Sequence, residues 1–283
     1  MLRGKWKNIK RKGLLPSCLF CLLVLAGWNR PVQAEEMTTV TENTKVMDVI
    51  EDPAFEGFGR LIFPADKTID SGLTLKDVGD ILTWYNYVNP ERTVEIVNYM
   101  KQQAEAGEQI FYDIYTEEEK AEDPDKENTG LFFFRGDPGE KFAVVNAGGG
   151  FAYVAAMHDS FPHALELSKK GYNAFALIYR PGAQTACEDL ARAIAFIFEN
   201  QEELEVDVTD YSLWGGLAGA RMAAWLGSYG TAEDYITRIQ ENGTPTKIEV
   251  FDGLPHGFGL GEGTVAEGWI DNAVDFWEEN MKE

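Results

Sequence analysis

Cysteine and histidine are both scarce in this 283-residue sequence, with three residues of each. Cys18 and Cys21 lie in an amino-terminal apolar stretch, so Cys187 is the one thiol beyond it. One thiol cannot form an intramolecular disulfide. His158 and His163 flank an expected helix start without partners at metal-ligand spacings, so we predict no metal site and no cofactor. Stability must then come from the apolar core.

Positive charge is scarce too, because 25 lysine and arginine residues face 47 aspartate and glutamate residues and leave a formal net charge of −22. Nucleic acids and anionic membranes are bound through clustered basic side chains, so we expect no nucleic-acid partner. Long hydrophobic runs are also missing. The apolar stretch 14–28 is shorter than the roughly 20 residues that a bilayer-spanning helix needs, and Pro16 interrupts it. We therefore expect no stable membrane insertion.

The amino-terminal residues follow the order of a secretory signal peptide. Basic residues between Arg3 and Lys12 precede the apolar stretch, and the small-residue exit Val32-Gln33-Ala34 follows it. Removing residues 1–34 takes away seven basic and no acidic residues, so the formal charge falls from −22 to −29. We predict cleavage after Ala34 and a secreted or extracytoplasmic protein.

The rest of the chain is expected to form one domain over residues 51–283. Residues 35–50 are polar and threonine-rich, which is typical of a flexible leader. Over residues 73–107 the apolar residues recur at helical spacing and Asn89-Pro90 indicates a helix start, which predicts a helical preface. The acidic run 117–127 is predicted to be a solvated loop between strands at 110–115 and 131–135.

Short apolar runs then alternate with amphipathic helical stretches. The predicted strands, buried on both faces, lie at residues 142–145, 174–179, 211–214 and 248–251. The predicted helices lie near Pro162, after a capping box formed by Thr185 and Glu188, over residues 218–229, and around Trp269. Alternation of this kind predicts an α/β fold with a mostly parallel, doubly wound sheet.

Two glycine-rich turns follow predicted strands of this sheet. One has the sequence Gly148-Gly149-Gly150-Phe151, and the other, which we call the elbow (residues 215–219), reads Gly215-Gly216-Leu217-Ala218-Gly219. Open α/β sheets bind their ligands at the carboxyl ends of strands. A third segment, Leu254-Pro255-His256-Gly257-Phe258, follows the last predicted strand. All three segments are expected to meet above one edge of the sheet.

These segments resemble the secreted acetyl esterase/lipase type of α/β hydrolase, in the branch related to hormone-sensitive lipase. The resemblance runs from about Ile50 to the carboxyl terminus and implies an α/β-hydrolase fold and a carboxylic-ester hydrolase ancestry. It assigns the oxyanion hole to the amides of Gly149, Gly150 and Ala218 and the general base to His256. The implied partner is a small-molecule ester or carboxylate.

Two departures from that family bear on catalysis. Leu217 stands where the family has its nucleophilic serine, and its hydrocarbon side chain has neither a lone pair to attack with nor a proton to give. Ordinary acyl transfer by this route is therefore excluded. The segment 231–247 is too short for the acid-bearing strand and loop, so we predict a sheet shortened by one or two strands between elbow and histidine. Asp234, Glu249 and Asp252 lack the acid's context, and the acid is left unassigned.

No other residue of this sequence restores the nucleophile. Ser228 lies about three helical turns beyond Leu217, Ser212 lies inside a predicted strand, and Cys187 lies outside both glycine turns. Three hypotheses stay open: an ester hydrolase by ancestry, a pseudoenzyme that binds small esters or carboxylates without turnover, and a truncated, inactive product.

Overall fold

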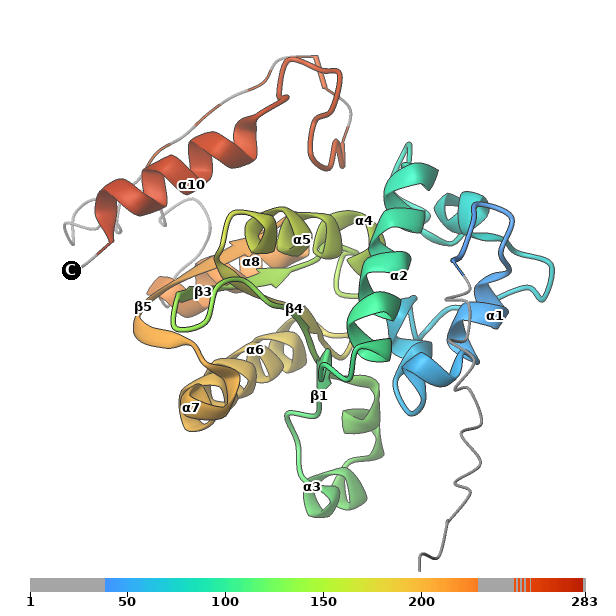
Figure 1. Ribbon diagram of the computed structural model, residues 1–283, viewed down its shortest axis with the longest axis horizontal. Coiled ribbons are helices and arrows are strands. Elements are labelled where there is room, and N and C mark those ends of the chain that lie inside the picture. Colours follow the sequence, from blue (N-terminus) through green and yellow to red (C-terminus); the bar gives the residue numbers. More distant parts are fainter. Residues whose placement is uncertain are drawn as a thin grey trace, which may run out of the picture. The chain divides into compact units, whose positions relative to one another are not determined.

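The computed structural model describes residues 39–228, 247, 249, 251, 253–254 and 256–281 (Figure 1). The predicted signal peptide lies outside these residues, as do Asp234, Asp252 and nearly all of the short segment before the histidine. Within the described part of the chain, no helix is both long and apolar enough to cross a bilayer.

A five-stranded sheet forms the centre of the described chain. Its strands, in spatial order, are β1 (Phe111–Tyr112), β2 (Gly130–Phe134), β4 (Asn173–Ile178), β3 (Lys141–Asn146) and β5 (Asp207–Gly215). The strand β3 pairs in parallel with both β4 and β5, whereas β2 pairs antiparallel with β4 and with β1. Every residue of β2 and β4 is buried, as strands covered on both faces require. The sheet is mixed, with two parallel and two antiparallel pairings, and with its helices it matches the predicted α/β fold class.

Helices cover this sheet on two sides. The chain passes from β3 through α4 (Ala156–Asp159) and α5 (Phe161–Lys169) to β4, and from β4 through α6 (Ala183–Glu199) and α7 (Gln201–Leu204) to β5. In Figure 1, α5 lies on one side of the strands and α6 on the other. The helix α8 (Ala218–Ser228) follows β5 and contacts α6, and in the last helix, α10 (Trp269–Asn280), Trp277 packs on Tyr172 with 4.7 Å between ring centroids.

The predicted strand 248–251 falls largely outside the described residues. Residues 248 and 250 are not described, and residues 249 and 251 belong to no strand. The prediction that the sheet is shortened therefore rests on the length of the segment before the histidine.

The leader predicted for residues 35–50 is folded over its described part. Residues Val46–Ile50 form α1, in which Val46 and Val49 are buried. The Asn98 side chain accepts a hydrogen bond from the Val40 amide at 2.9 Å and donates one to the Val40 carbonyl at 3.1 Å. Two valines three positions apart bury one side of a single turn, which is too short to produce a visible period in a threonine-rich segment.

The predicted helical preface is two separate helices. Residues Leu75–Ile81 form the 3₁₀ helix η3, and residues Pro90–Glu105 form α2; two further 3₁₀ turns, η1 (Pro53–Phe55) and η2 (Gly59–Ile62), come before them. The predicted start of α2 is confirmed, because the Asn89 side chain accepts from the Glu91 and Arg92 amides and Pro90 is the first helical residue. Between η3 and α2 runs a non-helical segment that carries Trp84 and Tyr85 to the site described below.

Two local predictions are wrong at helix starts. The acidic run contains α3 (Glu117–Glu122) and η4 (Pro124–Asn128), because Thr116 and Glu119 form a reciprocal capping box and acids suit the first turn of a helix. The helix α6 begins at Ala183 after Gly182, so Thr185 lies inside it and is not its cap. A cap motif is recognised by local spacing alone, and this one lies inside α6 because the helix begins two residues earlier, at Ala183.

Candidate functional site

The elbow is a tight turn from β5 into α8. Leu217 lies at its apex with φ of +52°, in the left-handed region that side chains other than glycine rarely adopt. A Cβ atom on Gly219 would lie 1.9 Å from the Asn146 carbonyl oxygen, and one on Gly215 would lie 2.3 Å from the Gly219 carbonyl carbon. Strand and helix therefore approach each other closely enough that both flanking positions require glycine.

This close approach makes a prediction about stability. We expect Gly219→Ala to lower the free energy of unfolding by about 2 kcal/mol, because the added methyl group meets backbone atoms that cannot move aside. Gly79→Ala is the matched control, since a Cβ there has no neighbour closer than 3.6 Å. Urea denaturation of both variants measures the difference, and equal stabilities would show that the elbow has room for a side chain at residue 219.

The glycine turn after β3 leaves two backbone amides without acceptors. Gly149 and Gly150 have φ of +122° and +62°, and a Cβ on Gly149 would lie 1.9 Å from the Tyr153 carbonyl oxygen. Among the described residues, no acceptor is bonded to the amides of Gly149 and Gly150, nor to that of Ala218 at the start of α8. These are the three amides that the family resemblance assigns to an oxyanion hole.

Asp159 lies beside the elbow, although no sequence pattern singled it out. The side chain sits at the end of α4, and the residue is 7% exposed. Its Oδ2 accepts hydrogen bonds from the Gly148 amide at 2.6 Å and from the Tyr85 hydroxyl at 3.0 Å. A Cβ on Gly216 would lie 2.4 Å from Oδ2, so the carboxylate touches the elbow backbone. Burial raises the pKa of Asp159 to about 6.

The partner that the described residues supply to His256 is a carbonyl oxygen. Its Nδ1 lies 3.1 Å from the Trp84 carbonyl oxygen, and its ring centroid lies 6.0 Å from that of Tyr85. When Nδ1 donates to this carbonyl, Nε2 is the nitrogen left to accept a proton. No carboxylate of the described residues is hydrogen-bonded to His256, and Glu249 binds Lys247 and Asn272 instead.

Two of the other candidate residues, His158 and Ser212, have hydrogen-bond partners away from the elbow. His158 Nε2 lies 2.9 Å from the Gly257 carbonyl oxygen, and burial lowers the pKa of His158. Ser212 accepts a hydrogen bond from the Trp214 indole at 2.6 Å, and burial raises the pKa of the Cys187 thiol. The Ser228 side chain lies outside the described part of the chain. Among the described residues, no three histidine, cysteine or acidic side chains gather in a way that could hold a metal ion.

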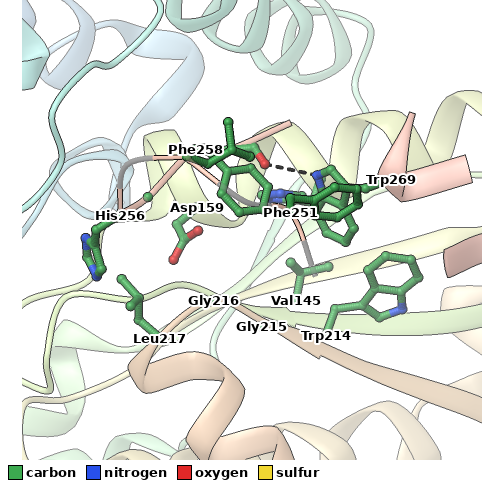
Figure 2. A pocket seen from close by; sticks show the side chains of 14 residues that line it. Val145, Asp159, Trp214, Gly215, Gly216, Leu217, Phe251, His256, Phe258 and Trp269 are labelled. Atoms are coloured by element: carbon green, nitrogen blue, oxygen red, sulfur yellow. Dashed lines mark hydrogen bonds between the residues drawn. The ribbon is translucent and has the colours of Figure 1, made fainter. Parts of the chain in front are cut away.

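A cavity of about 390 Å³ joins the elbow to the histidine segment. Figure 2 shows Asp159, Leu217 and His256 around one space, with aromatic rings beside them. The cavity has a mainly apolar and aromatic lining, which consists of Val145, Asp159, His163, Trp214, Gly215, Gly216, Leu217, Phe251, Leu254, His256, Gly257, Phe258, Gly259 and Trp269. A cavity of this size and lining suits a small organic ligand.

Sequence motifs mark Leu217 and His256, whereas no motif marks Asp159, Tyr85 or Trp84. The two found residues lie in short motifs after strands. The Tyr85 to Asp159 and Trp84 to His256 contacts join residues 74 and 172 positions apart, so no local pattern could reveal them.

Comparisons with known proteins agree with this architecture. Residues 137–252, less than half of the chain, match the family model BD-FAE. An acetyl ester-xyloside bifunctional hydrolase from Caldicellulosiruptor lactoaceticus superposes with a TM-score of 0.53 at 16% identity, over 60% of this chain and 95% of that one.

Two further structures align more weakly. A sugar hydrolase from Lactococcus lactis gives a TM-score of 0.46 at 16% identity, over 53% of this chain and 94% of that one. An esterase from Thermogutta terrifontis gives a TM-score of 0.33 at 23% identity, over 34% of this chain and 38% of that one. A search of curated proteins finds no match. The chain therefore has the α/β-hydrolase fold, and its residues 137–252 are similar to the BD-FAE domain.

Proposed function

We propose that this protein is a non-catalytic relative of carboxylic-ester hydrolases that binds small esters or carboxylates without ordinary serine-esterase turnover. The observation that carries the proposal is Leu217 at the apex of a strained strand-to-helix turn, beside a ligand-sized cavity. In a serine hydrolase this position presents the attacking hydroxyl. Here it presents a hydrocarbon side chain that is 42% exposed.

The remaining parts of the site favour binding over turnover. The amides of Gly149, Gly150 and Ala218 are free donors among the described residues, so they suit a carbonyl oxygen. By the family resemblance His256 would be the general base, yet Leu217 offers it no proton to take. Stabilising an oxygen without attacking its carbon polarises the carbonyl but breaks no bond. We also propose, from the amino-terminal pattern, that the chain is secreted.

Thermal unfolding with a soluble ester tests this proposal. We expect methyl benzoate at millimolar concentration to raise the melting temperature while proton NMR detects no benzoate above the spontaneous rate. Binding to the folded state raises apparent stability by mass action. Hydrolysis, or the absence of a shift across a panel of esters and carboxylates, would contradict the proposal.

Two variants locate the binding site. Leu217→Phe places a larger side chain at the cavity and is expected to reduce the shift in melting temperature. Val265→Phe is the matched control, because Val265 is 69% exposed and does not line the cavity. Equal shifts in the two variants would place the ligand elsewhere on the protein.

A further inference from the structure

One oxygen of Asp159 has no hydrogen-bond donor. The residue is 7% exposed and lines the cavity, and its Oδ2 takes both hydrogen bonds that the described residues supply, from Gly148 and Tyr85. Oδ1 accepts none from any described residue. An ionised carboxylate can only accept, so a ligand that meets Asp159 in the cavity must donate to it. Asp159 therefore offers a hydrogen-bond acceptor to a ligand.

The charge of the cavity lining also favours a ligand that donates hydrogen bonds and carries positive charge. No lysine or arginine lines the cavity within the described chain. Burial lowers the pKa of His163 to about 4, so this histidine brings no positive charge at neutral pH. His256 is exposed, with Nδ1 on the Trp84 carbonyl. A bound carboxylate would meet the negative charge of Asp159, and no lysine or arginine side chain of the described lining would offset it, so a positively charged ligand fits better beside Asp159.

Aromatic rings supply the rest of the contact surface. Trp214 and Trp269 stand with their ring centroids 6.3 Å apart at 44° (Figure 2). Both indole N–H groups are occupied, one by Ser212 Oγ at 2.6 Å and the other by the Gly259 carbonyl at 3.1 Å. The rings therefore offer apolar and π surface rather than donors. Tryptophan faces attract organic cations.

We propose that the cavity selects small primary ammonium compounds, whose N–H groups donate to Asp159 Oδ1 while the carbon skeleton packs on Trp214 and Trp269. This inference rests on the proposed function and narrows it. Among the ligands proposed above, esters that carry a primary amino group are preferred over neutral esters, and simple carboxylates are disfavoured; a primary ammonium compound without an ester isolates the group that is recognised.

A ligand series on one carbon skeleton tests the preference. Calorimetry at pH 7.5 would compare benzylammonium, benzyltrimethylammonium, benzyl acetate and benzoate. We expect benzylammonium to bind about 10 to 100 times more tightly than benzyl acetate, as a charged hydrogen bond contributes. Benzyltrimethylammonium keeps the charge but has no N–H donor, so it should bind more weakly than benzylammonium.

Two variants assign the preference to Asp159. Asp159→Asn should abolish the advantage of benzylammonium over benzyl acetate. Asp275→Asn removes the same charge from an exposed position on α10 and should leave the advantage intact. If Asp159→Asn does not fold, the series on the unchanged protein decides alone.

The possible failures are distinguishable. Benzyl acetate or benzoate binding as tightly as benzylammonium would overturn the inference and leave the proposed function standing. Equal binding of the trimethyl compound would overturn the hydrogen bond to Asp159. Binding of none of the four compounds would overturn both proposals.

Discussion

Restoring a serine at the elbow, by Leu217→Ser, is expected to produce slow hydrolysis of p-nitrophenyl acetate, up to about 10⁴-fold below a hydrolase with a complete triad. The unchanged protein should release nitrophenol no faster than His256→Ala, because Leu217 has no attacking atom. The carbonyl of Trp84 holds His256 through Nδ1, which favours the tautomer that accepts a proton at Nε2. That carbonyl carries no full negative charge, and the nearby Asp159 carboxylate accepts from Gly148 and Tyr85 instead of from His256, so we expect most of the acid's contribution to be missing.

Controls separate this chemistry from accidental reactivity. Leu226→Ser introduces the same hydroxyl elsewhere on α8 and should be inactive, and Leu217→Ser combined with His256→Ala should lose the gained activity. Full triad-like rates in Leu217→Ser would show that some carboxylate does orient His256. Hydrolysis by the unchanged protein above the His256→Ala rate would overturn the interpretation of Leu217.

The sequence predicts the central strands well, because strands that are buried on both faces consist of unbroken apolar runs. The run 142–145 and the run 174–179 both lie within a residue or so of β3 and β4, since a strand covered on both faces tolerates few polar residues. Strand ends are less visible. The pattern predicts a strand over residues 110–115, yet only Phe111 and Tyr112 pair, Phe111 with Phe132 and Tyr112 with Leu131 of β2.

The elbow shows the same division between local and long-range information. Its glycines follow from a local requirement, because strand and helix cannot approach with side chains at residues 215 and 219. The negative charge in the cavity lining comes from Asp159. This side chain is held beside the elbow by tertiary contacts, because its Oδ2 accepts from the Gly148 amide and from the Tyr85 hydroxyl. Sequence motifs thus predict a candidate site, whereas the ligand preference proposed for it rests on tertiary contacts.

The free energy of unfolding is expected to depend on pH through two buried groups, Asp159 and His163. Asp159 has a folded pKa of about 6 against an ordinary 3.8, so its contribution to stability is fully present below 3.8 and is lost as pH rises through 6. His163 has a folded pKa of about 4 against an ordinary 6.5, so its contribution is fully present above 6.5 and is lost as pH falls through 4. Each shift corresponds to about 3 kcal/mol. Between pH 4 and 6 the two contributions oppose each other.

Replacing either group should therefore reveal the pH dependence that the other group contributes to the free energy of unfolding. We expect the unfolding free energy of Asp159→Asn to rise by about 3 kcal/mol relative to the unchanged protein between pH 4 and 6, because its Asp159 contribution no longer declines. His163→Gln should show the opposite relative slope. Urea denaturation at intervals of half a pH unit measures both profiles, and differences from the unchanged protein cancel every other titrating group.

Asp275→Asn serves as the control for these profiles, because it removes a carboxylate from an exposed position on α10 and should follow the unchanged protein throughout. Parallel profiles for Asp159→Asn and the unchanged protein would mean that the Asp159 carboxyl titrates in its ordinary range. A carboxyl group that titrates in its ordinary range is well solvated, whereas Asp159 is only 7% exposed beside the elbow. That result would also weaken the inferred preference of the cavity for ammonium ligands.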